Sequence, residues 1–287
     1  MATFVHLTDL HIGDPALGIA SGAERLVPDP RPRTDTAERL GAGLARIAGM
    51  DPQPDFILVT GDLTNEGDVA SYQTLRTLMA DVAPPVLYGL GNHDSRGNFA
   101  SVFLGEAGRR APHDHDVLIG DVHVITLDSS EPGRVGGTLS PAQVDFLAEA
   151  LARHPGAGKV LSIHHPPATG PVAPPAYEAL DPDSTARLGE IVARGGLRAI
   201  LCGHIHKSRV TLWHGVPVVV TTGFHTAIDV LSPTGFQVMS NDAAFAVCTL
   251  TEHEFAVSYV ALPTDYEDLG RISEADIGRY EAALERS

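Results

Sequence analysis

Short runs of Val, Ile and Leu that end in a small or polar cluster recur along the chain, and helical patterns separate most of them. This alternation is typical of βα units around a buried sheet. Five of the six central runs lead into a motif rich in Asp, Asn or His. We predict central strands over residues 3–8, 56–60, 86–90, 122–127, 160–163 and 199–202.

Two segments between these runs carry helix signals. Leu40, Leu44 and Ile47 recur at helical spacing, and Ser140-Pro141-Ala142-Gln143 has the form of a capping box with proline at the first helical position. After Gly203 no helical pattern separates the apolar runs, so antiparallel strands that complete a sheet or sandwich are predicted. These late runs cover residues 210–213, 216–220, 245–249 and 255–261.

Two aperiodic, proline-bearing loops, residues 13–33 and 166–182, each begin just after a motif histidine. The rim of a substrate pocket and a plain surface connection are equally compatible with both loops. Ile277, Tyr280 and Leu284 share one face of the last segment, which predicts a short helix there. We predict one principal domain over residues 1–262 and a C-terminal tail over residues 263–287.

Polar motifs follow five of the predicted strands. In open α/β sheets, ligands bind in the crevice beyond the carboxyl ends of the strands. Each motif alone is common, but their repeated placement directly after apolar strands predicts one shared metal site. The motifs are Asp9-Leu10-His11, Gly61-Asp62, Gly91-Asn92-His93-Asp94, His164-His165 and Gly203-His204-Ile205-His206.

The mixture of ligand types indicates the kind of metal. Imidazole favours zinc, iron, copper or nickel, and carboxylate and amide oxygens extend the choice to manganese. A structural zinc site is usually closed by four Cys or His ligands, whereas this mixed set fits an open catalytic site. We expect two divalent transition-metal ions, with manganese, iron and zinc as candidates, separated by about 3.5–4 Å so that both can contact a phosphate group.

The ordered motifs from residue 9 to residue 206 resemble the signature of the calcineurin-like metallophosphoesterases, and they look most like those of the class III cyclic nucleotide phosphodiesterases and the related glycerophosphodiesterases. The resemblance implies an α/β fold, a four-layer αββα sandwich with two mixed sheets flanked by helices. It also implies a metal-dependent phosphodiesterase in which a metal-bridging hydroxide attacks a small soluble phosphodiester in line, with a 3′,5′-cyclic nucleotide favoured.

Other functions stay open beside this one. A glycerophosphodiesterase and a broad-specificity phosphomonoesterase or diesterase are alternatives within the same chemistry, and a non-catalytic scaffold of the same fold is an alternative of a different class. The intact motifs, His93 included, argue against the scaffold.

The resemblance also assigns roles to individual residues. His93 would be the catalytic residue that stabilises the phosphate charge or protonates the leaving alkoxide. Asp94 would orient His93, and His225 would line the substrate pocket or be structural. His165 is left out of the metal set, because an adjacent imidazole can simply hydrogen-bond the backbone. The implied ligands are Asp9, His11 and His206 for one metal, Asn92, His164 and His204 for the other, and Asp62 as the bridge.

Composition limits the partners. The formal net charge of −16 argues against a nucleic-acid or anionic-membrane surface, since such partners are held by clustered Lys and Arg. A small-molecule phosphodiester is therefore the expected partner. Similar proteins often form dimers or larger oligomers, so a homo-oligomer and a monomer both stay open.

Location and redox state follow from the remaining features. No apolar run reaches the roughly 18 residues that a membrane span needs, and no leader pattern opens the chain, so a cytoplasmic protein is expected. Cys202 and Cys248 are too few for a disulfide framework. Buried free thiols are the favoured state, with a single bond between the two as the alternative.

Overall fold

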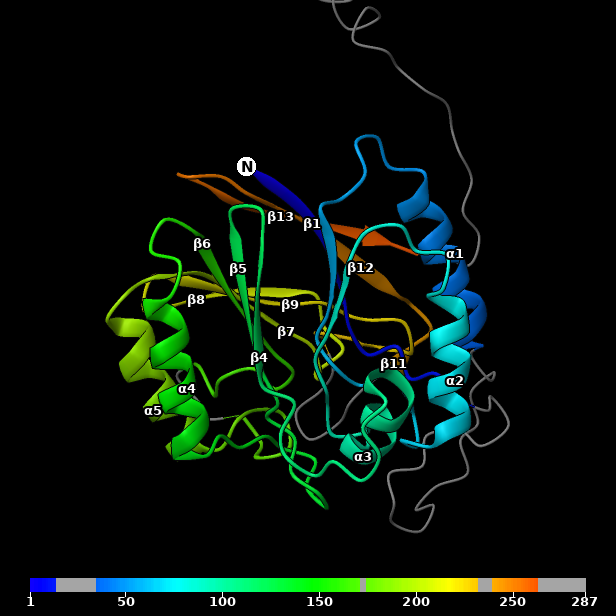
Figure 1. Cartoon of the computed structure of the whole chain (residues 1–287), viewed down its shortest axis with the longest axis horizontal. Helices are drawn as coiled ribbons and strands as arrows, with labels where there is room; N and C mark the ends of the chain where they lie inside the picture. Colours follow the sequence, from blue (N-terminus) through cyan, green and yellow to red (C-terminus); the bar gives the residue numbers. More distant parts are fainter. Residues whose placement is uncertain (14–34, 171–173, 232–238, 263–287) are drawn as a thin grey trace, which may run out of the picture.

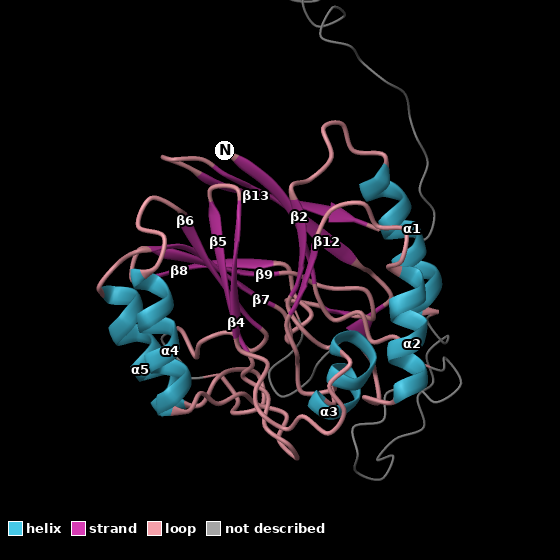
Figure 2. Cartoon of the chain, in the orientation of Figure 1, coloured by secondary structure: helices cyan, strands magenta, loops and turns pink. Residues whose placement is uncertain are grey.

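Two large mixed sheets pack face to face, and helices cover their outer faces (Figures 1 and 2). The computed structural model describes residues 1–13, 35–170, 174–231 and 239–262. The architecture is the predicted four-layer αββα sandwich. Within the described ranges, no helix is both long enough and apolar enough to span a bilayer.

The first sheet has the strand order β13-β12-β1-β2-β3. Its three early strands are parallel, and the two late strands are added antiparallel at the edge of β1. The strands are β1 (Ala2–Leu7), β2 (Phe56–Val59), β3 (Val86–Tyr88), β12 (Ala244–Leu250) and β13 (Phe255–Ala261).

The second sheet has the order β4-β5-β6-β7-β9-β8, with β5, β6, β7 and β9 parallel and the two edge strands antiparallel. A separate two-stranded ribbon joins β10 (Ala227–Ile228) to β11 (Met239–Ser240). The strands of the second sheet are β4 (His115–Ile119), β5 (Val122–Leu127), β6 (Gly158–Ile163), β7 (Leu197–Cys202), β8 (Arg209–Trp213) and β9 (Val216–Val220).

Two helices lie on each side of the paired sheets, with α1 and α2 on one side and α4 and α5 on the other (Figure 1). A short helix and a π-helical turn follow the motif after β3. The helices are α1 (Thr36–Ala48), α2 (Val69–Leu78), α3 (Arg96–Phe99), η1 (Ala100–Leu104), α4 (Pro141–Ala152) and α5 (Pro182–Ala193).

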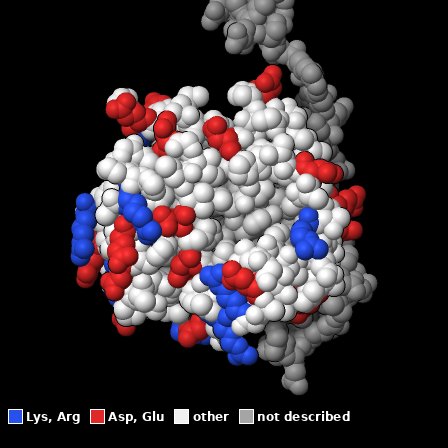
Figure 3. Space-filling view, viewed as in Figure 1, with Lys and Arg blue, Asp and Glu red and all other residues white. Residues whose placement is uncertain are grey.

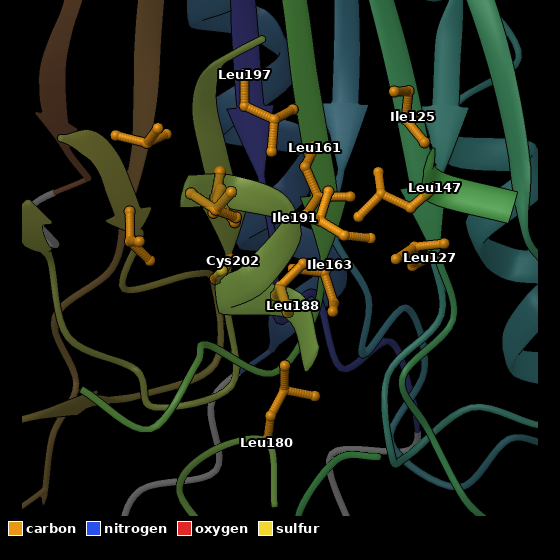
Figure 4. Packing of buried hydrophobic residues seen from close by; sticks show 14 of the residues in the cluster. Ile125, Leu127, Leu147, Leu161, Ile163, Leu180, Leu188, Ile191, Leu197 and Cys202 are labelled. Atoms are coloured by element: carbon orange, nitrogen blue, oxygen red, sulfur yellow. The ribbon is translucent and has the colours of Figure 1, made fainter. Parts of the chain in front are cut away.

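The core is built in three layers because the strands bury both faces. In β1, Phe4 packs between the sheets while Val5 faces the helices, as the period of two requires. The Phe4 and Phe56 rings stack at 4.6 Å between the sheets. On the outer face of the second sheet, strand residues such as Ile125 and Leu161 pack with Leu147 and other helix residues (Figure 4).

The predicted strands are confirmed, with boundaries shifted by at most two residues. The four late runs are also strands, and they form two antiparallel pairs, β8 with β9 and β12 with β13, as predicted. The pairs lie in different sheets, and β9 also pairs with β7, in parallel. The capping box is confirmed, since the Ser140 side chain accepts from the backbone N–H of Gln143 and the Gln143 side chain accepts from that of Ser140.

Other sequence predictions meet the structure only in part. The loop predicted over residues 166–182 ends where α5 begins, with Pro182 as the first helical residue. Cys202 and Cys248 are buried free thiols, as favoured. The predicted loop at 13–33 lies almost wholly outside the described residues, and so does the tail at 263–287, so the domain boundary at residue 262 stays a prediction.

Candidate metal centre

All five polar motifs begin at the carboxyl ends of parallel strands. The motifs follow β1, β2 and β3 in the first sheet and β6 and β7 in the second, and these ends lie at the lower edge of the molecule in Figure 1. Residues from four of the five motifs line one open hollow. The motif residues that line it are His11, Asp62, Asn92, His93, His204, Ile205 and His206.

The backbone at the strand ends is strained. Seven described residues other than glycine have a positive φ, and five of them are predicted metal ligands. Such conformations cost about 1–3 kcal/mol each and concentrate at functional sites. The five are Asp9 (φ 49°), His11 (44°), Asp62 (49°), His204 (73°) and His206 (49°).

Two glycines give the carboxylates room. A Cβ atom at Gly91 would collide with the Asp62 carboxylate, and one at Gly203 would lie 2.5 Å from Asp9 Oδ2. The glycines of the GNHD and GHIH motifs are therefore required by close approach at the site rather than by a turn alone.

The buried carboxylates of Asp9 and Asp62 form the centre of the site. Asp62 Oδ2 lies 3.5 Å from His11 Nε2 and 3.3 Å from His164 Nε2, so it stands between two histidines that come from different sheets. Asp9 Oδ1 lies 3.3 Å from His206 Nε2. Asp62 therefore lies between side chains that the two sheets bring together.

The electrostatics keep both carboxylates ionised. Burial acts to raise the pKa of Asp62, but the neighbouring His164 and His93 hold that pKa well below its ordinary value. Burial likewise opposes ionisation of Asp9, and His206 lowers the pKa of that carboxyl in spite of it. In return, although burial lowers the pKa of His164, the Asp62 carboxylate raises it to about 9.

Each predicted histidine ligand is held by one ring nitrogen. His164 Nδ1 donates to the Thr60 carbonyl at 3.0 Å, and His206 Nδ1 donates to the Thr226 carbonyl at 2.7 Å. Bonds of this kind fix the orientation of metal-binding histidines.

The other two predicted histidine ligands are held in the same way. His204 Nε2 donates to the Tyr177 carbonyl at 2.6 Å, and His11 Nδ1 lies 3.2 Å from Asn65 Oδ1. In all four histidines one nitrogen is therefore left to bind an ion.

Two of these nitrogens, and the side-chain oxygen of Asn92, have no hydrogen-bond partner. His11 Nε2, His164 Nε2 and Asn92 Oδ1 are buried without a hydrogen bond, although an unmade hydrogen bond at a buried polar atom costs about 1–3 kcal/mol. The two nitrogens have the Asp62 carboxylate as an ion-pair neighbour. Divalent cations would satisfy all three. The ligand atoms of Asp9, His11 and His206 also lie within 4.8 Å of one another, as do those of Asp9, Asp62 and His164. The donor set therefore fits bound metal.

His93 lies beside the centre. Its backbone N–H donates to Asp62 Oδ1 at 2.9 Å, and its Nδ1 donates to the Asn65 carbonyl at 2.8 Å. The His93 side chain borders the hollow.

The hypothesis that Asp94 orients the His93 ring needs correction. Asp94 instead accepts from the backbone N–H groups of Gly91 and Leu63 and from the Tyr72 hydroxyl. It fastens the turn after β3 to the turn after β2. Sequence reasoning missed Asn65, which orients both His11 and His93, and only its place three residues after Asp62 could have drawn attention to it.

The two remaining histidines have different environments. Both ring nitrogens of His165 are hydrogen-bonded, to Ser129 Oγ at 2.7 Å and to the Val135 carbonyl at 2.9 Å, which supports its exclusion from the metal set. His225 lines the hollow with its ring 4.8 Å from that of His11. Tyr177 and Glu178 also line the hollow, so this part of the loop predicted at 166–182 forms a rim.

Comparison with known proteins agrees with this geometry. The profile of the family described as "Calcineurin-like phosphoesterase" matches residues 2–208. A relative described as a probable cyclic nucleotide phosphodiesterase of Rhodococcus erythropolis is 33% identical over 222 residues, which are 76% of this chain and 69% of the relative.

A cAMP/cGMP dual specificity phosphodiesterase of Mycobacterium tuberculosis is 34% identical over 217 residues, 74% of this chain and 66% of that protein. Among solved structures, the Plasmodium protein GAP50, titled the anchor in the inner membrane complex, superposes with a TM-score of 0.56 at 12% identity and covers 99% of this chain and 94% of its own. At that identity, the likeness concerns the fold alone.

Proposed function

Because the chain belongs to the calcineurin-like phosphoesterase family, hydrolases of phosphoesters that use divalent metals, we propose that it is a dinuclear phosphodiesterase of small soluble phosphodiesters and that a 3′,5′-cyclic nucleotide is its favoured substrate. The observation that carries the proposal is that the buried His11 Nε2 and His164 Nε2, which make no hydrogen bond, lie 3.5 Å and 3.3 Å from the Asp62 carboxylate.

The ligands divide between two ions. In our proposal Asp62 belongs to both sites, which its position between His11 and His164 supports. When bound, two such ions supply electrophilic stabilisation of phosphate oxygens and a water of lowered pKa. Manganese, iron and zinc are the candidate metals. The first site consists of Asp9, His11 and His206, and the second of Asn92, His164 and His204.

His93 handles the leaving group in this proposal. Because its Nδ1 proton is committed to the Asn65 carbonyl, Nε2 is the atom that faces a substrate and from which a proton can pass to the departing alkoxide. The short bond to Asn65 holds the ring in one orientation, so the proton is delivered at a fixed place. His225 borders the same hollow and is proposed to contact the substrate.

The proposed substrate class agrees with the hollow and with the charge of the protein. The hollow is concave and lined by apolar side chains beside the polar motif residues, as small-molecule sites are. The net charge is −16, and on the face seen in Figure 3 basic side chains lie scattered among acidic ones without forming a continuous track. A small phosphodiester therefore fits better than a nucleic acid.

The test is hydrolysis by protein reconstituted separately with Mn, Fe or Zn. The substrates are 3′,5′-cyclic AMP, a glycerophosphodiester, bis-p-nitrophenyl phosphate and a simple monoester. We expect metal-dependent diester turnover, with kcat/KM highest for the cyclic nucleotide. Asn92→Ala should lose bound metal and activity together. His93→Ala should keep its metal and lose about 10²–10⁴-fold in kcat.

The control is His253→Ala, because the His253 side chain is 83% exposed and has no part in the site. It should retain wild-type activity. A higher kcat/KM for the glycerophosphodiester would replace the cyclic nucleotide with that substrate. Tightly bound metal without turnover of any of the four substrates would contradict the enzymatic proposal and favour a scaffold.

A further inference from the structure

Exposed apolar side chains gather at the hollow. Val135, Tyr177 and Met239 are 46%, 49% and 40% exposed, and all three line it together with Ile205 and Ile228. A single exposed apolar residue needs no explanation, but several that share one concave surface mark a binding site. This apolar part of the hollow adjoins the metal ligands His204 and His206, which line it as well.

Two of these residues are anchored to the site through their backbones. The Tyr177 carbonyl accepts from His204 Nε2 at 2.6 Å, and the Val135 carbonyl accepts from His165 Nε2 at 2.9 Å. The carbonyls make these bonds, and both residues line the hollow. We call this pair the Val135/Tyr177 wall.

The two segments that carry the Val135/Tyr177 wall are also hydrogen-bonded to each other. Gly137 donates its N–H to the Ala179 carbonyl at 3.1 Å, and Asp181 donates to the Gly137 carbonyl at 2.9 Å. These bonds tie the segment that carries Val135 to the segment that carries Tyr177. The wall is therefore held at a fixed place relative to the metal ligands.

The ribbon of β10 and β11 supplies a second apolar surface. Ile228 and Met239 are paired across the ribbon, and both line the hollow. The Ile228 N–H donates to the His206 carbonyl at 2.9 Å, which anchors the ribbon to a predicted metal ligand. The hollow thus has an apolar lining fastened at two places to the metal centre.

We propose that this lining binds a planar aromatic group of the substrate, a nucleobase in the natural diester, and that Tyr177 is the residue that determines this specificity. Tyrosine presents a large rigid face on which a base can stack, and a methionine sulfur packs favourably against aromatic rings. A glycerol group would meet these apolar side chains with hydroxyls. The inference rests on the proposed phosphodiesterase function and names its substrate class.

The test compares two ligands that share a phosphate and differ in the base. Binding of adenosine 5′-monophosphate and of ribose 5-phosphate to Mn-loaded protein is measured by calorimetry. We expect wild type to bind the nucleotide at least about tenfold more tightly. Tyr177→Ala should reduce that ratio to about two, and Tyr177→Phe should preserve it.

The alanine variant is a clean probe because His204 is anchored by the backbone carbonyl of residue 177, which the substitution keeps. Metal content is measured in every variant. If Tyr177→Ala loses metal, Met239→Ala is compared with wild type instead, and a reduced ratio of the two ligand affinities is again expected.

Equal affinities for the two ligands in wild type, or an unchanged ratio in the alanine variant, would overturn the inference. Turnover of bis-p-nitrophenyl phosphate is measured on the same samples and reports on the proposed function separately. Turnover together with equal affinities would refute the aromatic-binding surface and support the phosphodiesterase function. Tenfold discrimination without turnover would support the aromatic-binding surface and count against the phosphodiesterase function.

Discussion

Asn65 joins a predicted metal ligand to the predicted catalytic residue. Its side-chain oxygen lies 3.2 Å from His11 Nδ1, and its backbone carbonyl accepts from His93 Nδ1 at 2.8 Å. The two bonds use different parts of the residue, so a side-chain substitution separates them. A substitution at Asn65 therefore removes the contact that orients His11 and keeps the carbonyl that orients His93.

We predict that Asn65→Ala weakens metal binding by about 10–100-fold, because the imidazole of His11 loses the partner that fixes its orientation. The affinity is measured by competition with a chelator of known strength. Asn65→Asp keeps an acceptor at that place and should recover the affinity. Unchanged affinity in the alanine variant would mean that the contact has no orienting role.

The site residues differ in how far sequence could predict them. Asp62 and His164 follow apolar strands in recognisable motifs, so their residue type and position pointed to a ligand. The partners that orient the histidines gave no such signal, because Thr60 and Tyr177 act through backbone carbonyls that any residue would supply. Asp94 was misread for a related reason, since its hydrogen bonds go to a neighbouring turn.

At the level of elements, a buried ion pair fastens α3 to the segment after β5. Arg96 Nε donates to Asp128 Oδ2 at 2.7 Å, and the Asp128 side chain is fully buried. Asp128 also accepts from the N–H of His113 and from that of Ser130. Since α3 follows the motif that contains His93, this network joins the first sheet to the second beside the site.

We predict that Arg96→Ala lowers the free energy of unfolding by about 3 kcal/mol, because it leaves a buried carboxylate without its cation. Arg134→Ala is the matched control, since the Arg134–Glu131 pair is about half exposed and should contribute less than about 1 kcal/mol. Urea denaturation measures both. Similar losses in the two variants would refute the special role of the buried pair.

Helices and strands were predicted correctly where the apolar pattern of the sequence was strong, and they were missed where that pattern was weak. The central strands bury both faces, so they stand out as continuous apolar runs. Strand β4 is a half-buried edge strand that begins His-Asp, and it was missed. Helix α5 starts at Pro182, capped by Asp181, where the predicted loop ends, and it was not predicted. No local pattern could show that β9 would pair parallel with β7, because that choice depends on the whole sheet.

His6 connects the two sheets of the molecule. Its Nε2 lies 2.9 Å from Thr60 Oγ1 at the end of β2, and its Nδ1 lies 3.0 Å from Thr221 Oγ1 at the end of β9. Burial, opposed only in part by Asp9, lowers the pKa of His6 to about 3. The folded protein therefore holds this histidine neutral.

Stability should consequently fall in acid. In the unfolded chain His6 takes up a proton near pH 6.5, so its contribution is complete above that pH and is lost progressively as the pH falls toward 3. Between pH 7 and pH 5 the loss from this group is about 2 kcal/mol. Urea denaturation at the two pH values should show a drop that is smaller by this amount in His6→Gln. Equal drops would show that His6 is not neutral in the fold.

The metal centre should also stabilise the molecule as a whole, because its ligands come from both sheets and converge only when the sheets are packed. Without metal, His11, His164 and Asn92 each leave a buried atom unpaired, and Asp9 and Asp62 hold strained backbone conformations. Each ion that binds only the folded state at 100 times its Kd adds about 2.7 kcal/mol. For a domain of this size, one such ion corresponds to a rise in Tm of about 5–10 °C.

We predict that removing metal with a chelator lowers Tm by at least this amount and that adding Mn²⁺ restores it, as followed by calorimetry. His253→Ala should behave as wild type, since its exposed ring has no part in the site. Asn92→Ala should gain much less from Mn²⁺, yet its apo Tm should not fall, because the substitution removes an unpaired buried oxygen. A smaller gain from Mn²⁺ together with an unchanged or higher apo Tm is expected of a metal ligand. A residue that only supports the fold would lower the apo Tm when it is replaced. A Tm that is the same with and without saturating metal would mean that the strand ends keep their strained, unpaired geometry for some purpose other than holding ions.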